Sequence, residues 1–219
     1  MDVTIHGNPD YGELTVKLEP TETIKIESGA MSRMTPTLEM KSHMMGGFGA
    51  ALARKLVGGE SFFVGEYGGA RGGELALSPS SPGTVCHRKV AGQGLFLTAG
   101  SFLACTPGVH LRTRFGGFRA LFSGEGAFLL RVEGSGDLWF NSYGAVVERE
   151  VDGQMTVDTG HVVAWEPGLD YSIQGMGGLK STLFSGEGLT MSFRGKGRIW
   201  LQTRKLPATA GWLSPYLAG

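Results

Sequence analysis

Short runs in which apolar and polar residues alternate recur along the whole chain. The stretch "GELTVKL" (12–18) is one example, and "GTVCHRKV" (83–90) and "GAVVEREV" (144–151) have the same character further along. Alternation with a period of two is typical of strands that bury one face and expose the other. Glycine, proline and aspartate bound these runs, which indicates tight turns between neighbouring strands. The pattern therefore predicts an all-β protein.

The alternating runs belong to a unit that occurs three times along the chain. Each copy contains an alternating segment that ends in glycine and a proline seven positions after that glycine. The segments are "IKIESG" (24–29), "LFLTAG" (95–100) and "MTVDTG" (155–160), and the prolines are Pro36, Pro107 and Pro167. The three units span residues 12–78, 83–141 and 144–203. We expect three similar β-sandwich-like units with internal pseudo-threefold symmetry, in one all-β domain (1–206) followed by a C-terminal tail (207–219).

The first unit departs from the pattern in an insertion, "KSHMMGGFGAALARKLVGG" (41–59). Within it, residues 49–57 are the only segment that we predict to be helical. The insertion combines large apolar side chains with two cations, and its candidate contact residues are Met44, Met45, Phe48, Arg54 and Lys55. Two interpretations stay open: the insertion docks on a partner or a membrane surface, or it is a lid over one end of the β-core.

Three tryptophans are further candidates for contact with a ligand or partner. Trp139 and Trp200 occupy the same position in the last strand of the second and third units. They form either a stacking platform for bases or an amino acid, or part of the packing between strands. Trp212 lies in the tail, where it either packs back on the body or contacts a neighbouring subunit.

The charge balance narrows the class of partner. Twenty basic and twenty acidic side chains cancel, so no global field draws the protein to nucleic acid or to anionic lipid. Nucleic-acid binding is therefore not expected, because phosphate contacts need clustered Lys and Arg. The N-terminal "MDVTIHGNPDY" (1–11) lacks the basic start and apolar run of a signal peptide, which indicates a cytoplasmic protein.

Glycine–glutamate pairs recur at the same place in the three units. The glutamates are Glu60, Glu125 and Glu187. Three carboxylates near a threefold axis would suit a bound cation, whereas a carboxylate paired with a cation of its own unit would be structural. The glycine-rich "GMGGLKS" (175–181) lacks the spacing of a phosphate-binding loop. Since Cys86 and Cys105 also form no metal or redox motif, we predict no catalytic residue, no metal site and no cofactor.

Several stretches, taken in order, resemble the family of altered inheritance of mitochondria protein 24 and its bacterial relatives. The resemblance is carried by "IHGNPDYGELTVKLEP" (5–20), "LVGGESFF" (56–63) and "LFSGEGAF" (121–128), and it covers nearly the whole chain. It implies a fold similar to that of the tryptophan RNA-binding attenuation protein, a TRAP-like fold. Mitochondrial members of the family are linked to inner-membrane organisation, and the resemblance brings no catalytic residues. The stretch "PTET" (20–23) departs from the Pro-Gly-Glu-like turn usual in the family, which indicates a local change of turn.

These observations favour a non-enzymatic scaffold or interaction protein. We expect it to form a homo-oligomer or to bind a protein partner, and peripheral contact with a membrane surface fits the same role. The alternative is a small-molecule or RNA-binding module of TRAP-like fold, whose ligand the sequence does not identify. An enzyme with a site assembled between units is the weakest of the three hypotheses, because no catalytic constellation is visible in the sequence.

Overall fold

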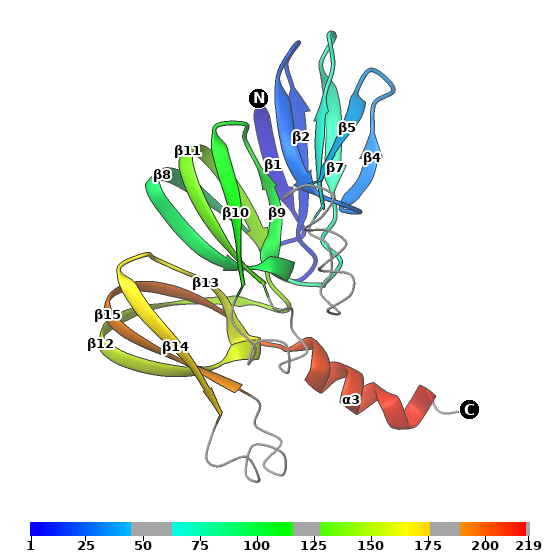
Figure 1. Cartoon of the computed structure of the whole chain (residues 1–219). Helices are drawn as coiled ribbons and strands as arrows, with labels where there is room; N and C mark the ends of the chain where they lie inside the picture. The colour runs from blue at the N-terminus through cyan, green and yellow to red at the C-terminus, as the bar shows by residue number, and fades with distance from the viewer. Residues whose placement is uncertain (45–62, 116–127, 176–188, 218–219) are drawn as a thin grey trace.

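The protein is mostly β, with antiparallel strands, and the part of the chain that the structure describes contains one α-helix (Figure 1). The computed structural model describes residues 1–44, 63–115, 128–175 and 189–217. For reference, residues 12–78, 83–141 and 144–203 are called the first, second and third segments. Strand β1 (Asp2–His6) precedes the first segment, and helix α3 (Leu206–Leu217) follows the third.

The strands of the three segments have the following bounds. The first segment contains β2 (Glu13–Leu18), β3 (Thr23–Glu27), β4 (Met31–Met34), β5 (Glu39–Met44), β6 (Phe63–Gly68) and β7 (Gly73–Leu77). The second contains β8 (Val85–Thr98), β9 (Phe102–Cys105), β10 (Val109–Phe115) and β11 (Phe128–Asn141). The third contains β12 (Val146–Asp158), β13 (Val162–Trp165), β14 (Leu169–Gly175) and β15 (Leu189–Gln202).

The described strands form two sheets. One has the order β1-β2-β7-β4, and the larger one runs β12-β15-β13-β8-β11-β9-β3-β6-β5, with β10 paired to β11 and β14 paired to β15. Figure 1 shows the strands of the three segments as successive groups that fan out from the blue N-terminal end to the yellow and orange C-terminal end. The first and third segments therefore lie at opposite ends of the fan.

Two short antiparallel pairings join one segment to the next. Strand β3 pairs with β9, with Lys25 opposite Cys105 and Ile26 opposite Ala104. Strand β8 pairs with β13, with Phe96 opposite Trp165 and Leu97 opposite Ala164. We call these pairings the first and second junctions. Each junction continues a sheet from one segment into the next, because a strand that is paired on one side still has unpaired backbone groups on the other.

The prolines that mark the repeated pattern lie in three turns with the same hydrogen bonds. In each turn the residue before the proline donates its N–H to a strand carbonyl and accepts that strand residue's N–H with its side-chain oxygen. The pairs are Thr35 with Glu74 (2.9 and 3.1 Å), Thr106 with Asp137 (3.0 and 2.9 Å), and Glu166 with Arg198 (3.0 and 2.9 Å). Proline suits these turns because its ring fixes φ near the value that the second turn position requires.

Successive side chains in the last strands of the second and third segments, β11 and β15, lie in two different core clusters, as a period of two predicts. Leu138 and Phe140 lie in the cluster centred on the second segment, whereas Trp139 lies in the cluster of the first segment. Likewise, Ile199 lies in the cluster of the third segment, and Trp200 packs in that of the second. Each tryptophan therefore fills the space between its own segment and the preceding one.

The prediction that residues 49–57 are the only helical segment is wrong, because the tail begins a helix, α3, at Leu206. Pro207 lies in its first turn, where the missing N–H has no intrahelical acceptor to lose. Gly211 and Pro215 weaken the helical signal without ending the helix. Residues 49–57 lie outside the described part of the chain. Within that part, no helix is long and apolar enough to cross a membrane.

Candidate functional site

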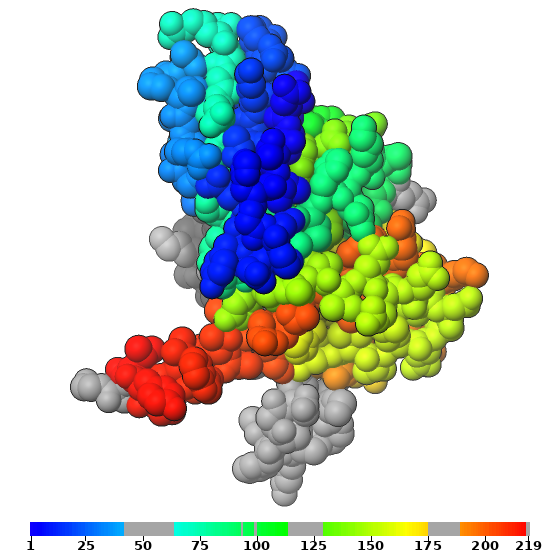
Figure 2. All heavy atoms as spheres, turned by 180° about the vertical axis from the view of Figure 1, so that it is seen from behind, coloured from blue at the N-terminus to red at the C-terminus, as the bar shows by residue number. Residues whose placement is uncertain are grey.

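Helix α3 is an apolar element that projects from the body of the protein (Figures 1 and 2). Its sequence, "LPATAGWLSPYL", contains no charged residue. The helix is described over its whole length, and none of its residues is buried. Trp212 is 67% exposed and Tyr216 is 76% exposed. A contiguous run of exposed aromatic and aliphatic side chains of this kind is typical of a surface that binds a partner.

The aromatic side chains of α3 lie on one face of the helix. Trp212 and Tyr216 are four residues apart, so they are neighbours on the helix surface. Their ring centroids are 6.0 Å apart. Leu213 and Leu217 follow each of them by one position and are also exposed. The result is a stripe of four large side chains over the last half of the helix.

The base of α3 is fixed to the body of the protein by polar contacts. Lys205 Nζ donates to Asp158 Oδ2 at 2.6 Å, and Tyr143 Oη donates to Thr209 Oγ1 at 2.9 Å. Burial acts to raise the pKa of Asp158, but hydrogen bonds from Lys205 and the Gly160 N–H outweigh it and hold this pKa below its usual value. The ion pair is therefore intact at neutral pH and is lost only as the pH falls through the depressed pKa of Asp158.

A cleft of about 450 Å³ opens where α3 leaves the body. Among the residues that line it are Tyr143, His161, Arg204, Lys205, Thr209 and Trp212. His161 Nδ1 lies 2.7 Å from the carbonyl oxygen of Gln202. Because a carbonyl only accepts, Nδ1 carries the proton and Nε2 of the neutral ring is an acceptor. The cleft thus combines the guanidinium group of Arg204 with the aromatic side chains of Tyr143 and Trp212.

The two tryptophans that share a repeat position are buried, Trp139 at 3% and Trp200 at 1% exposure. His87 stacks on Trp139 with ring centroids 5.3 Å apart, and its Nε2 lies 2.7 Å from Asp137 Oδ1. The guanidinium of Arg88 lies 5.0 Å from the centroid of the Trp200 ring. Their placement fits the packing interpretation. In this structure protein side chains cover both rings, which leaves little surface for a stacked base.

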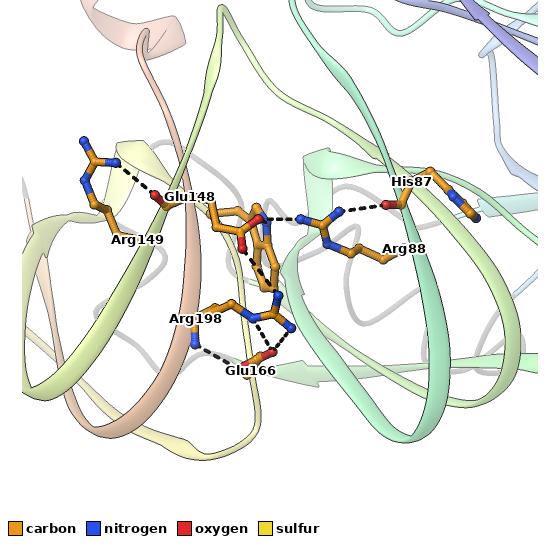
Figure 3. Close-up of polar contacts among 7 residues, drawn as sticks. His87, Arg88, Glu148, Arg149, Glu166 and Arg198 are labelled. Carbon is orange, nitrogen blue, oxygen red and sulfur yellow. Dashed lines mark hydrogen bonds and ion pairs between the residues drawn. The ribbon is translucent and has the colours of Figure 1, made fainter.

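A carboxylate-centred network links the second and third segments beside Trp200 (Figure 3). Glu148 on β12 accepts hydrogen bonds from Arg88 on β8 and, at 2.8 Å, from Trp200 Nε1. Arg198 on β15 reaches Glu148 at 3.4 Å and Glu166 at 2.7 Å. The ion pairs are half exposed, so each contributes no more than about 1 kcal/mol. The network orients these side chains around the indole, and the sequence alone did not reveal it because its members are far apart in the chain.

The two cysteines are poor nucleophiles. Burial raises the pKa of Cys86 to about 11 and that of Cys105 to about 12, so both thiols are protonated at neutral pH. Cys105 lies in the core cluster of the second segment, and Cys86 packs against that cluster. Within the described residues, no group of three His, Cys, Asp or Glu side chains is placed to hold a metal ion.

Most of the predicted contact residues of the insertion lie outside the described residues: Met45, Phe48, Arg54 and Lys55. Met44 ends β5 with its backbone opposite Phe63, and its side chain is outside the described part. The glycine–glutamate residues Glu60, Glu125 and Glu187 are outside it as well. Of the predicted contacts, Trp212 is therefore the one with a described and exposed side chain. Its place on a helix was missed because Pro207, Gly211 and Pro215 resemble turn signals.

The fold and these surfaces define a mostly β protein that exposes an apolar helix. Comparison with known proteins places it in a family: the model of mitochondrial biogenesis AIM24 matches residues 3–204, and the chain belongs to this family. It is 33% identical over 228 residues to the uncharacterized protein M6_Spy0233 of Streptococcus pyogenes, covering 99% of this chain and 91% of that protein. The crystal structure of protein SPYM3_0169 from Streptococcus pyogenes is similar with a TM-score of 0.83 and 32% identity, covering 99% of both chains.

Proposed function

We propose that this protein is a non-enzymatic interaction scaffold that presents α3 to a protein partner. The observation that carries the proposal is the exposure of a charge-free helix with Trp212 and Tyr216 on one face. Aromatic side chains bury about 150–250 Å² each when they enter an interface, and they are enriched among the residues that dominate binding energy. A helix laid in an apolar groove uses side chains at this four-residue spacing as anchors.

A protein groove fits α3 better than a lipid surface does. Helices that lie in a membrane interface usually carry Lys and Arg on the polar face, which attract anionic lipid. The polar positions of α3 are Thr209 and Ser214, and its sequence has no cation to provide that attraction. Membrane-surface association is therefore the weaker form of the proposal, and vesicle binding is an outcome of the test below.

The scaffold itself would consist of three β-sandwich-like units of TRAP-like fold, a pseudo-threefold repeat along the chain. The three turns with equivalent hydrogen bonds support this arrangement. The strand pairing supports it too. In the second and third segments, β8 pairs with β11 and β12 pairs with β15 as long strands, whereas in the first segment the same pairing is divided between two shorter pairs, β2 with β7 and β3 with β6. Such a body holds α3 at a fixed position, and the protonated thiols of Cys86 and Cys105 agree with a non-enzymatic role.

The test is to replace Trp212 and Tyr216 together by alanine. Because both are exposed, the fold should be unaffected, while capture of the partner should fall by tenfold or more if they anchor an interface. The measurement is affinity capture from cell extract with cross-linking and quantitative mass spectrometry, followed by titration of the partner that is found. Tyr11→Ala is the matched control, because Tyr11 is an equally exposed aromatic residue far from α3 in the sequence.

Two results would contradict this proposal. One is a set of captured proteins that is the same for the wild type and for the double variant. The other is flotation with neutral or anionic lipid vesicles that depends on Trp212, since this would make a lipid surface the occupant of α3.

The cleft at the base of α3 favours a second candidate function, the binding of a small anionic molecule. Its volume of about 450 Å³ lies in the range of ligand sites, and Arg204 provides positive charge. A panel of small carboxylates and phosphates, screened by the shift in thermal unfolding temperature, tests this candidate. A stabilising hit should be lost in Arg204→Ala, and a panel without any hit would leave the interaction scaffold as the only function supported by a surface.

A further inference from the structure

A third pair of strand edges matches the two junctions but has no partner within the described residues. The first junction joins β3 to β9, and the second joins β8 to β13. In the third segment, the strand equivalent to β3 and β8 is β12. In the first segment, the strand equivalent to β9 and β13 is β4. Among the described strands, β12 pairs only with β15 and β4 only with β7. The two edges cannot reach each other in one chain, because the segments that carry them lie at opposite ends of the fan (Figure 1).

Met34 on β4 is placed like the residues that form the junctions. The Thr35 N–H donates to Glu74, so the next pair along, Met34 and Leu75, is not hydrogen bonded to each other. The N–H and C=O of Met34 therefore point away from β7, toward the open edge. The same rule applies to Cys105, which lies opposite Leu138, and to Trp165, which lies opposite Ile199. Their backbone groups point away from the paired strand, and these two residues form the junctions.

The apolar side chains around β4 are exposed where their equivalents in the other segments are covered. Met31 is 37%, Met34 is 40% and Met40 is 54% exposed. At the same positions, the second segment has buried Phe102, Cys105 and Leu111, and the third has buried Val162 and Trp165 and half-buried Tyr171. The first segment thus presents the apolar surface of a junction without the neighbour that covers it in the other two. Exposed methionines suit such a surface, because their flexible side chains adapt to a partner.

The free edge of β12 has the matching position at Thr156. Lys25, Phe96 and Thr156 each precede the glycine of the repeated segment by four residues, and the first two form the junctions. Residues 153–157, "GQMTV", carry no charged side chain. Natural proteins usually protect an open edge with lysine, proline or a bulge, and an unprotected one readily accepts another strand.

We infer that β12 of one copy pairs with β4 of a second copy of this chain, with Thr156 opposite Met34. The contact is antiparallel, as both junctions are, and it covers Met31, Met34 and Met40. It is head-to-tail, so repeated contacts give a ring when the rotation closes and an open filament when it does not. This inference deepens the proposed role as a scaffold and rests on it, but it concerns two strand edges and not α3.

The experiment uses two full-length variants, Met34→Pro and Thr156→Pro. Proline removes the outward N–H and blocks one edge in each variant. Wild type should assemble with rising concentration, whereas each variant alone should stay monomeric in sedimentation velocity and native mass spectrometry. An equimolar mixture should form a heterodimer, because Met34→Pro retains an intact β12 edge and Thr156→Pro retains an intact β4 edge. Misfolded variants would not complement each other in this way.

The controls keep the N–H of each edge: Met34→Thr and Thr156→Val should assemble as the wild type does. A wild type that stays monomeric, proline variants that assemble normally, or a mixture without heterodimer would overturn the inference. The double alanine variant of Trp212 and Tyr216 separates the two proposals. It should assemble normally but no longer bind the partner of α3. Assembly that depends on these two residues would show that α3, and not β12, covers the surface formed by Met31, Met34 and Met40.

Discussion

Replacing Trp165 by alanine is expected to destabilise the protein by about 3–5 kcal/mol, the range for truncating a large aromatic side chain in a packed core. Trp165 is fully buried in the third segment. Its ring lies 5.3 Å from that of Phe96, 5.1 Å from that of Tyr171 and 5.6 Å from that of Phe193, all measured between centroids. The loss is large because Phe96 comes from the second segment, so the cavity would also weaken the second junction.

The free energy of unfolding is measured by urea denaturation followed by far-ultraviolet circular dichroism. The matched control is Trp212→Ala, which removes the same side chain from an exposed position and should change the free energy of unfolding by no more than about 0.5 kcal/mol. A loss below about 1 kcal/mol for Trp165→Ala would contradict the placement of this ring at the centre of the core.

Replacing Gly94 by alanine is expected to destabilise the protein by about 3 kcal/mol or more. Gly94 lies in β8 with φ at +60°, a conformation that costs other residues about 1–2 kcal/mol. An added Cβ would also lie 2.0 Å from the carbonyl oxygen of Val132, on the paired strand β11. The neighbouring atom is backbone, so relief would require the strands to separate at the irregularity between Val132 and Gly134.

Gly92 provides a matched control two residues away in the same strand. Its φ is +69°, but a Cβ added there would meet nothing within 4 Å. Gly92→Ala should therefore lower the free energy of unfolding only by the cost of the left-handed backbone conformation, about 1–2 kcal/mol. The same denaturation experiment measures both variants. Equal losses at the two positions would show that the close approach of Val132 does not constrain β8.

The sequence predicted the strands and their turns well, because both depend on local signals. Period-two alternation predicted strands whose successive side chains point to opposite faces, and Trp139 accordingly lies in a different core cluster from Leu138 and Phe140. The helix α3 was not predicted, since its proline and glycine residues are typical of turns and its apolar side chains have no core to face. Local composition does not record that a segment is helical and exposed.

The candidate surfaces depend on information that one sequence does not contain. Met34 and Cys105 occupy equivalent positions in the repeated pattern, but only the order of strands shows that one lies at an open edge and the other at a junction. Similarly, the contact of Arg88 with Glu148 links residues 60 positions apart and follows from how two segments pack. Edge position is a property of the assembled sheets, so it could not be read from the alternating pattern.

The central claim is that this chain is a scaffold whose β4 and β12 edges are covered by other copies, and residue-resolved hydrogen exchange tests it most directly. The amides of Met34 and Thr156 should exchange more slowly as protein concentration rises, because each gains a hydrogen bond in the contact between copies. Amides already paired within the sheets, such as that of Thr35, should not change with concentration. Exchange at Met34 and Thr156 that is fast and the same at every concentration would contradict the account.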